Sequence, residues 1–374
     1  MKKIFFILIA VFLVFLFIPG SGASAQPPPA NKVAKIQEAI NKAKALKTKA
    51  DKIYQQALNE TVKKFGDEYA KAKTDAERRK VVDQARKFFQ QRLRTLGWGR
   101  AKKAKDEAFQ RIIQEVNKTY KIDTRNVRGE PTFSQDVEGE GECYPDGTVR
   151  IGPSAFTSPG VVASTKKHEA THADQAAGGR WPRGAVERHD AEIEAYGKEM
   201  TSADTVGLTD AERNEVLTRL RYHLAQKKVA LINEIRSAKT SMNNDKQRKE
   251  LDKIVRKVHQ IQKMEEKGDE EKAIQQKNEI IKEIEQLIKG AKDQAKNTLE
   301  RIRDHFNELK EAELFVIKVE TIEDLRDARD VPIAGKDQKE EINKIIDKLK
   351  RLIDTQKKGK ESEVMDPSLL LGSE

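Results

Sequence analysis

The sequence predicts a mainly α-helical protein with a small α+β segment between two helical regions. Charged residues make up 36% of the 374 residues and aromatic residues 6%, which suits long amphipathic helices better than one large globular core. Apolar residues recur at helical spacing before residue 123 and after residue 205. Between about residues 123 and 160, Gly, Pro, Ser and Thr become frequent while Lys thins out. The length is typical of two or three domains.

Residues 1–25 have the features of a secretory signal peptide. Two lysines precede an apolar run from Ile4 to Ile18, and Ala23 and Ala25 occupy the A-x-A positions of a cleavage site. The run is short for a membrane-spanning helix. We predict cleavage after Ala25, with an uncleaved N-terminal anchor as the alternative, and a mature protein that is secreted or lies in the periplasm or cell envelope.

The net charge of +11 must be interpreted together with this predicted export. Outside the cytosol, the positively charged chain is expected to bind an anionic envelope surface or an acidic partner protein. No nucleic-acid partner is expected. Charges of both signs are interleaved, which is typical of solvated helix faces. Cys143 is the single cysteine, so an intramolecular disulfide is excluded and metal ligands must come from His, Asp and Glu.

The N-terminal helical region covers residues 26–122. After a proline-rich spacer, breaks at Lys73–Asp75 and Leu96–Gly99 predict three helices folded back on one another. Because this N-terminal region precedes the α+β segment, it is also compatible with a pro-segment that covers the cleft. One apolar stripe has coiled-coil-like spacing: Val33, Ile36, Ile40, Ala43, Ala50, Tyr54 and Ala57.

The segment 123–205 contains the predicted β-structure and two helices. Pro145-Asp146-Gly147 is a tight-turn signal, and the strand Thr148–Ile151 after it indicates a hairpin. Ser158 can cap a helix that begins at Pro159 and stops near Gly178. A second helix is predicted from about Ala185.

Residues 206–356 are predicted to be helical again, and residues 357–374 to form a disordered tail. Leu314–Ile317 is a short apolar run of ambiguous type. The heptad stripes predict packing seams, which serve either self-association or an intramolecular bundle: Ile274, Ile281, Ile284, Ile288, Ala291, Ile342, Ile346, Leu349 and Ile353.

The stretch KKHEATHADQ contains the pattern H-E-x-x-H in His168, Glu169 and His172. On a helix, His168 and His172 are four residues apart, so both imidazoles lie on one face and can hold one ion. Glu169 is one step round the helix, where it can activate a water bound to that ion. Three of the six histidines of the chain lie between residues 168 and 189. We therefore predict a Zn²⁺ site.

A catalytic zinc site needs a third protein ligand. Glu192 lies twenty positions after His172 on the second predicted helix, and it is the first choice. His189 shares its face at three residues' distance and is the second choice, whereas Glu194 points away. Asp174 can orient a ligand imidazole. The rival ligands are Glu187, His189, Asp190 and Glu194.

The segment His168–His172, followed by Glu192 in the frame E-x-x-A-Y, resembles the zincin metallopeptidases and in particular their gluzincin branch. It is similar to the short zincin domains of bacterial secreted and toxin-associated proteins. The metzincin pattern is not met, because Gln175 and Gly178 stand at its glycine and third-histidine positions. The resemblance covers about residues 130–205 and implies a small α+β zincin-like domain with a hairpin and two active-site helices.

The resemblance implies a zinc metalloendopeptidase that hydrolyses a peptide or protein substrate. His168, His172 and Glu192 become zinc ligands, and Glu169 becomes the general base that deprotonates the attacking water. Thr148–Ile151 corresponds to the edge strand that aligns an extended substrate. Tyr196 or His189 is expected to stabilise the oxyanion.

Two other functions stay open at this point. One is an exported structural or adhesion-type helical protein whose zincin-like core binds metal without turnover; the other is a toxin-like effector that cleaves a foreign protein. Glu169→Gln separates turnover from mere binding. The remaining histidines sit singly in charged helices, where surface or seam positions are expected: His223, His259 and His305.

Overall fold

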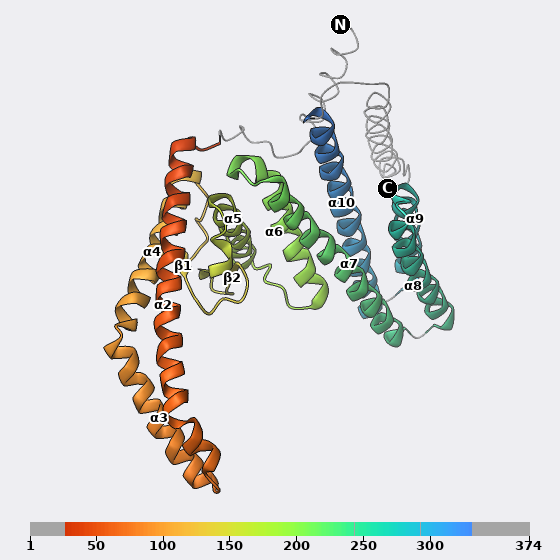
Figure 1. Ribbon diagram of the computed structural model, residues 1–374. Coiled ribbons are helices and arrows are strands. Elements are labelled where there is room, and N and C mark those ends of the chain that lie inside the picture. The colour runs from red at the N-terminus through yellow and green to blue at the C-terminus, as the bar shows by residue number, and fades with distance from the viewer. Residues whose placement is uncertain (1–26, 243, 292, 331–374) are drawn as a thin grey trace. The chain divides into compact units, whose positions relative to one another are not determined.

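The structure is a computed structural model that describes residues 27–242, 244–291 and 293–330. Within these residues the chain forms nine α-helices and one three-stranded sheet (Figure 1). The prediction of a mainly α protein with a minor β part is therefore confirmed. The predicted leader, the tail and the heptads at 342–353 lie outside the described residues. No helix in the described ranges has the length and apolar character needed to span a membrane.

The chain packs as two compact units. The first comprises Met1–Arg180 and Thr201–Arg213, and the second comprises Trp181–Met200 and Asn214–Glu374. Helix α6 (Ala185–Val206) is continuous and contributes residues to both.

Three helices begin the first unit, as the sequence predicts: α2 (Ala30–Lys71), α3 (Asp75–Thr95) and α4 (Trp98–Tyr120). Thr74 and Glu77 form a reciprocal capping box that starts α3. Gly97 has φ 75°, a left-handed conformation that lets the chain turn from α3 into α4. Most of the predicted stripe of α2 is buried, and α2 packs against α4.

The sheet has the order β1-β3-β2, with β1 (Thr132–Phe133), β2 (Gly141–Cys143) and β3 (Val149–Ile151). β2 and β3 form the predicted antiparallel hairpin, and β1 pairs with β3 in parallel. The expectation that Thr148–Ile151 is an edge strand is wrong, because β1 occupies its other side. β1 is two residues long, too short for an alternating pattern to reveal it. The edge strand of the hairpin is β2.

Helix α5 (Pro159–Ala177) carries the H-E-x-x-H motif and is buried on nearly every side. It begins as predicted, since Ser158 Oγ accepts a hydrogen bond from the Val161 amide at 3.2 Å and Pro159 occupies the first turn. α2, α4, β2 and β3 all contact it. These contacts fix its rotation about its own axis.

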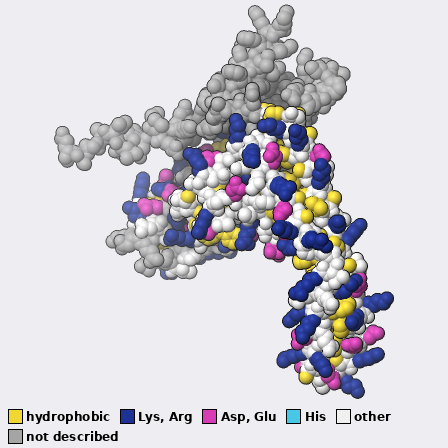
Figure 2. Space-filling model, turned by 90° about the vertical axis from the view of Figure 1, so that its left-hand side faces the viewer, with side chains coloured by type: hydrophobic (Ala, Val, Ile, Leu, Met, Phe, Trp, Pro, Cys, Tyr) yellow, Lys and Arg dark blue, Asp and Glu magenta, His cyan; other side chains and the backbone are white. Residues whose placement is uncertain are grey.

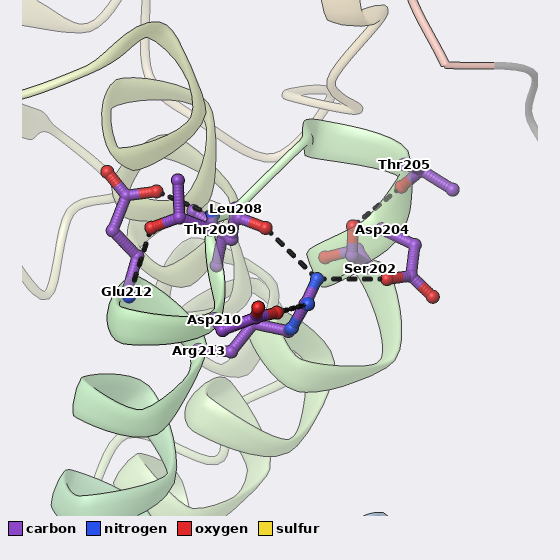
Figure 3. Close-up of polar contacts among 8 residues, drawn as sticks. All are labelled: Ser202, Asp204, Thr205, Leu208, Thr209, Asp210, Glu212 and Arg213. Carbon is purple, nitrogen blue, oxygen red and sulfur yellow. Dashed lines mark hydrogen bonds and ion pairs between the residues drawn. The ribbon is translucent and has the colours of Figure 1, made fainter. Parts of the chain in front are cut away.

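The turn between α6 and α7 (Asp210–Ser241) is held by side chains of both helix ends (Figure 3). Arg213 donates to the Leu208 carbonyl at 3.0 Å and to Asp204 at 3.2 Å. Thr209 and Glu212 cap the start of α7 reciprocally, with Thr209 N donating to Glu212 Oε2 at 2.8 Å. The last turn of α6 is thereby fixed within the first unit.

The second unit contains most of α7 together with α8 (Asp245–Glu266), α9 (Glu270–Lys289) and α10 (Asp293–Asp330). α9 packs against both α8 and α10. Ile274 forms a buried cluster with Leu314 and Ile317, so the ambiguous run at 314–317 is helical and belongs to the core. The described part of the predicted seam therefore packs within the chain.

Candidate metal centre

His168 and His172 direct the same ring nitrogen toward one point. Their Nε2 atoms lie 3.1 Å apart, and His168 is buried. Two ligand nitrogens at zinc–nitrogen distances in tetrahedral geometry lie about 3.3 Å apart. The pair is therefore spaced for joint coordination of one ion, as the i, i+4 pattern predicts.

Gln175 orients the imidazole of His172. The Gln175 Oε1 atom lies 2.8 Å from His172 Nδ1, and Gln175 is buried. An amide oxygen is an acceptor, so it favours the proton on Nδ1 and leaves the Nε2 lone pair available to a metal. Asp174, the residue predicted for this role, instead accepts a hydrogen bond from Asn126 Nδ2 at 2.9 Å. Asp174 is exposed, and Gln175 points inward from the next position.

Glu192 is the residue of the second helix that the structure brings to the histidine pair. Ligand atoms of His168, His172 and Glu192 all lie within 4.8 Å of one another. Two imidazoles and one carboxylate are a donor set that suits zinc. The donor atoms therefore fit the metal that the sequence predicts.

The rivals of Glu192 have other contacts. His189 Nδ1 lies 3.2 Å from His223 Nδ1, and Asp190 pairs with Lys227 and with His305. Glu194 pairs with Lys198 at 3.0 Å. The carboxylate of Glu187 lies against Gly184 at the start of α6.

Contacts within the first unit join the start of α5 to the end of α6. A Cβ on Gly160, in the first turn of α5, would lie 3.0 Å from the Gly207 carbonyl oxygen and 3.1 Å from that of Val206. Ser158 Oγ also donates to Glu212 Oε1 at 2.7 Å, which ties the start of α5 to the start of α7. The absence of a side chain at Gly160 thus permits the close approach of the start of α5 to the end of α6, both within the first unit.

Glu169 is 5% exposed and lies under the edge strand β2. A Cβ on Gly141 of β2 would lie 2.7 Å from Glu169 Oε1 and 2.9 Å from Thr165 Cγ2. Cys143, two residues along β2, is half-buried, and its burial together with the negative charge of Glu169 raises the pKa of its thiol to about 12. The carboxylate therefore has a glycine and a neutral thiol as neighbours on β2.

His189, Tyr196 and His223 form a ring cluster in the second unit. The Tyr196 and His223 rings stack with centroids 5.5 Å apart. Burial, followed by the charge of Arg188, lowers the pKa of His189, and burial together with the Glu192 carboxylate raises the pKa of Tyr196. Both side chains thus stay uncharged at neutral pH. Sequence reasoning placed His223 singly in a charged helix, because no local pattern connects it to a partner 34 residues away.

Comparison with protein-family models, with curated proteins and with solved structures finds no match to this chain.

Proposed function

We propose that this protein is an exported zinc metallopeptidase in which His168, His172 and Glu192 hold the metal. The observation that carries the proposal is the convergence of their ligand atoms within 4.8 Å. The 3.1 Å spacing of the two Nε2 atoms and the bond from Gln175 to His172 support it. A zinc ion held there would supply a Lewis acid that lowers the pKa of a water and polarises a carbonyl.

Glu169 is proposed as the general base. Its carboxylate takes a proton from the attacking water and passes it to the leaving amine. It adjoins His168 on a helix whose rotation is fixed by packing on several sides, so its direction is set before substrate binds. A preorganised base of this kind needs no rearrangement during the reaction.

An extended peptide is proposed to align along β2, the edge strand of the hairpin. Edge strands accept an added strand through main-chain hydrogen bonds. Because Gly141 of β2 lies against Glu169, a peptide bound there passes beside the proposed base. His189 or Tyr196 is proposed to donate a hydrogen bond to the oxyanion, since both are uncharged donors near Glu192 in sequence.

Metal content tests the proposal first. Residues 26–374 should bind one zinc per chain by elemental analysis, and His168→Ala and Glu192→Ala should each lose it. His259→Ala is the matched control, because His259 is exposed and contacts Gln262; this variant should keep its zinc.

Turnover is tested with a mixture of peptides and mass-spectrometric detection of products. Glu169→Gln should abolish cleavage while zinc stays bound. Zinc binding without cleavage of any peptide or protein would favour the structural or adhesion-type alternative. A chain that binds no zinc when it is offered would overturn both interpretations.

A further inference from the structure

The α2–α3 hairpin presents an exposed apolar face. Among the described residues seven large hydrophobic side chains are exposed, and five of them lie on this hairpin: Tyr54, Leu58, Val62, Tyr69 and Val82. Val62 is 61% exposed and Val82 42% exposed. Within the described part of the chain, none of the residues of α3 is buried. Figure 2 shows hydrophobic side chains among Lys, Arg, Asp and Glu side chains on this hairpin, at the bottom of the view.

Helix geometry places these side chains on one side of the hairpin. At 100° per residue, Leu58, Val62 and Tyr69 point within about 40° of one another. Tyr54 is one turn before Leu58, and its ring packs edge-on against Phe89 of α3 with centroids 5.3 Å apart. Val82 is seven residues before Phe89 and therefore points the same way. The two stripes form one continuous face across both helices.

Two arginines lie on the same stripe of α3. Arg79, Val82, Arg86 and Phe89 follow at intervals of three, four and three residues, so both guanidinium groups project beside Val82. The hairpin from Asp51 to Thr95 carries twelve Lys and Arg against seven Asp and Glu. Apolar and aromatic side chains bordered by arginine match the boundary between anionic headgroups and acyl chains. Tyr54 and Tyr69 are of the residue type that favours this boundary.

A second copy of the chain fits this face less well. A two-fold interface brings the same stripe of each copy together, which would gather Arg79 and Arg86 of both copies into one contact area. Like charges at such a contact are unfavourable. The charge of the face therefore favours an anionic occupant.

We propose that the apolar face of the α2–α3 hairpin, formed by Leu58, Val62, Tyr69 and Val82 with Arg79 and Arg86, binds an anionic lipid surface. The apolar side chains enter the headgroup–acyl boundary, and the two arginines contact lipid phosphates. Binding at this face requires nothing of the metal centre, so His168→Ala leaves it unchanged.

Co-sedimentation with vesicles tests this docking face. The probe is residues 26–374, which retain every described residue and lack the apolar run 4–18 that would bind lipid by itself. Vesicles of phosphatidylglycerol and phosphatidylcholine should bind the chain at least tenfold more strongly than phosphatidylcholine alone. Val62→Asp with Val82→Asp should weaken that binding at least tenfold, whereas Val229→Asp, at a 45% exposed valine of α7, should not.

A charge control lies on the same helix. Arg79→Glu with Arg86→Glu should weaken binding at least tenfold. Lys80→Glu with Lys87→Glu makes the same change in net charge one position round the helix, away from the face, and should weaken binding less than threefold. Circular dichroism establishes that each variant is folded.

Three outcomes would overturn the docking face. The first is no binding to anionic vesicles, and the second is equal weakening by the two charge-reversal pairs. The third is a concentration-dependent dimer in sedimentation equilibrium that Val62→Asp abolishes, which would make this face a self-association interface.

Discussion

Gly141 leaves room for the carboxylate of Glu169. A Cβ added to Gly141 would lie 2.7 Å from Glu169 Oε1 and 2.8 Å from Glu169 Cγ, closer than atoms of this kind approach in folded proteins. Strand β2, which we propose to align the substrate, thus approaches Glu169 closely at Gly141. Glu169 is the proposed base, and Gly141 has no side chain to obstruct it.

Gly141→Ala should displace Glu169 and lower peptide hydrolysis. A shift of about 1 Å in a catalytic group can reduce the rate about a hundredfold, so we expect a loss of kcat/KM of about tenfold to a hundredfold. Zinc content should not change, because the atoms nearest to an added Cβ belong to Glu169 and Thr165, which are not among the proposed ligands. Gly139→Ala is the control, since its Cβ would meet the Gly141 carbonyl oxygen at 3.8 Å, an ordinary contact. Equal activity in the two variants would show that the close approach does not position the base.

Gln175→Leu should weaken zinc binding without removing a ligand. The amide oxygen of Gln175 holds His172 Nδ1 at 2.8 Å, and loss of such a partner typically reduces metal affinity 10–100-fold. Asp174→Ala is the control, because Asp174 contacts Asn126 rather than a ligand. Competition with a chromogenic chelator measures both affinities. An unchanged affinity in Gln175→Leu would mean that packing orients His172 without this bond.

Removing one carboxylate from a buried ion cluster should destabilise the second unit. Lys277 lies 2.6 Å from Glu265, Lys228 lies 2.8 Å from Glu313, and each lysine also contacts the other glutamate. Glu313→Gln leaves two buried ammonium groups with one carboxylate, a change that typically costs about 3–5 kcal/mol of unfolding free energy. Calorimetry should show a lower unfolding temperature. Glu38→Gln, which breaks the exposed pair with Lys42, should change nothing measurable, and an equally small effect of Glu313→Gln would contradict the prediction.

Local sequence patterns predicted the helix limits and the histidine pair. Ser158-Pro159 and the break at Lys73–Asp75 are signals contained within one turn, and His168 and His172 need one helical turn to meet. The contact of Gln175 with His172 was also predictable from the sequence, because the two residues are three apart on the same helix. Asp174 was predicted for this role because it carries a carboxylate, although its side chain points outward from the helix and is exposed.

Contacts that depend on tertiary packing were not predictable in this way. β1 is two residues long, so no alternation marks it, and it pairs with β3 although β2 lies between them in the sequence. The partner of His189 is His223 on another helix, and the partner of His305 is Asp190, over a hundred residues away. Neither spacing corresponds to a period of helix or strand.

His305 should make the stability of the second unit depend on pH in the alkaline range. Burial lowers the pKa of its imidazole, but hydrogen bonds to Asp190 and Glu308 and the charge of Asp190 outweigh that effect and raise the pKa to about 9, against the opposing charge of Lys227. His305 Nδ1 lies 3.2 Å from Asp190 and 3.3 Å from Glu308, and the side chain is 11% exposed. A raised pKa means that the folded state binds the proton more tightly than the unfolded state.

The stabilisation from His305 is therefore complete below the unfolded-state pKa of about 6.5 and is lost as the pH rises through about 9. Its size is at most about 3.5 kcal/mol, because each pKa unit corresponds to about 1.4 kcal/mol. The unfolding temperature of the unaltered chain should fall relative to that of His305→Gln between pH 6.5 and 9.5, measured by calorimetry with chelator present so that metal binding makes no contribution. Taking the difference between the two chains isolates this group from other titrations. Parallel curves for the two chains over this range would show that His305 is not protonated in the folded protein.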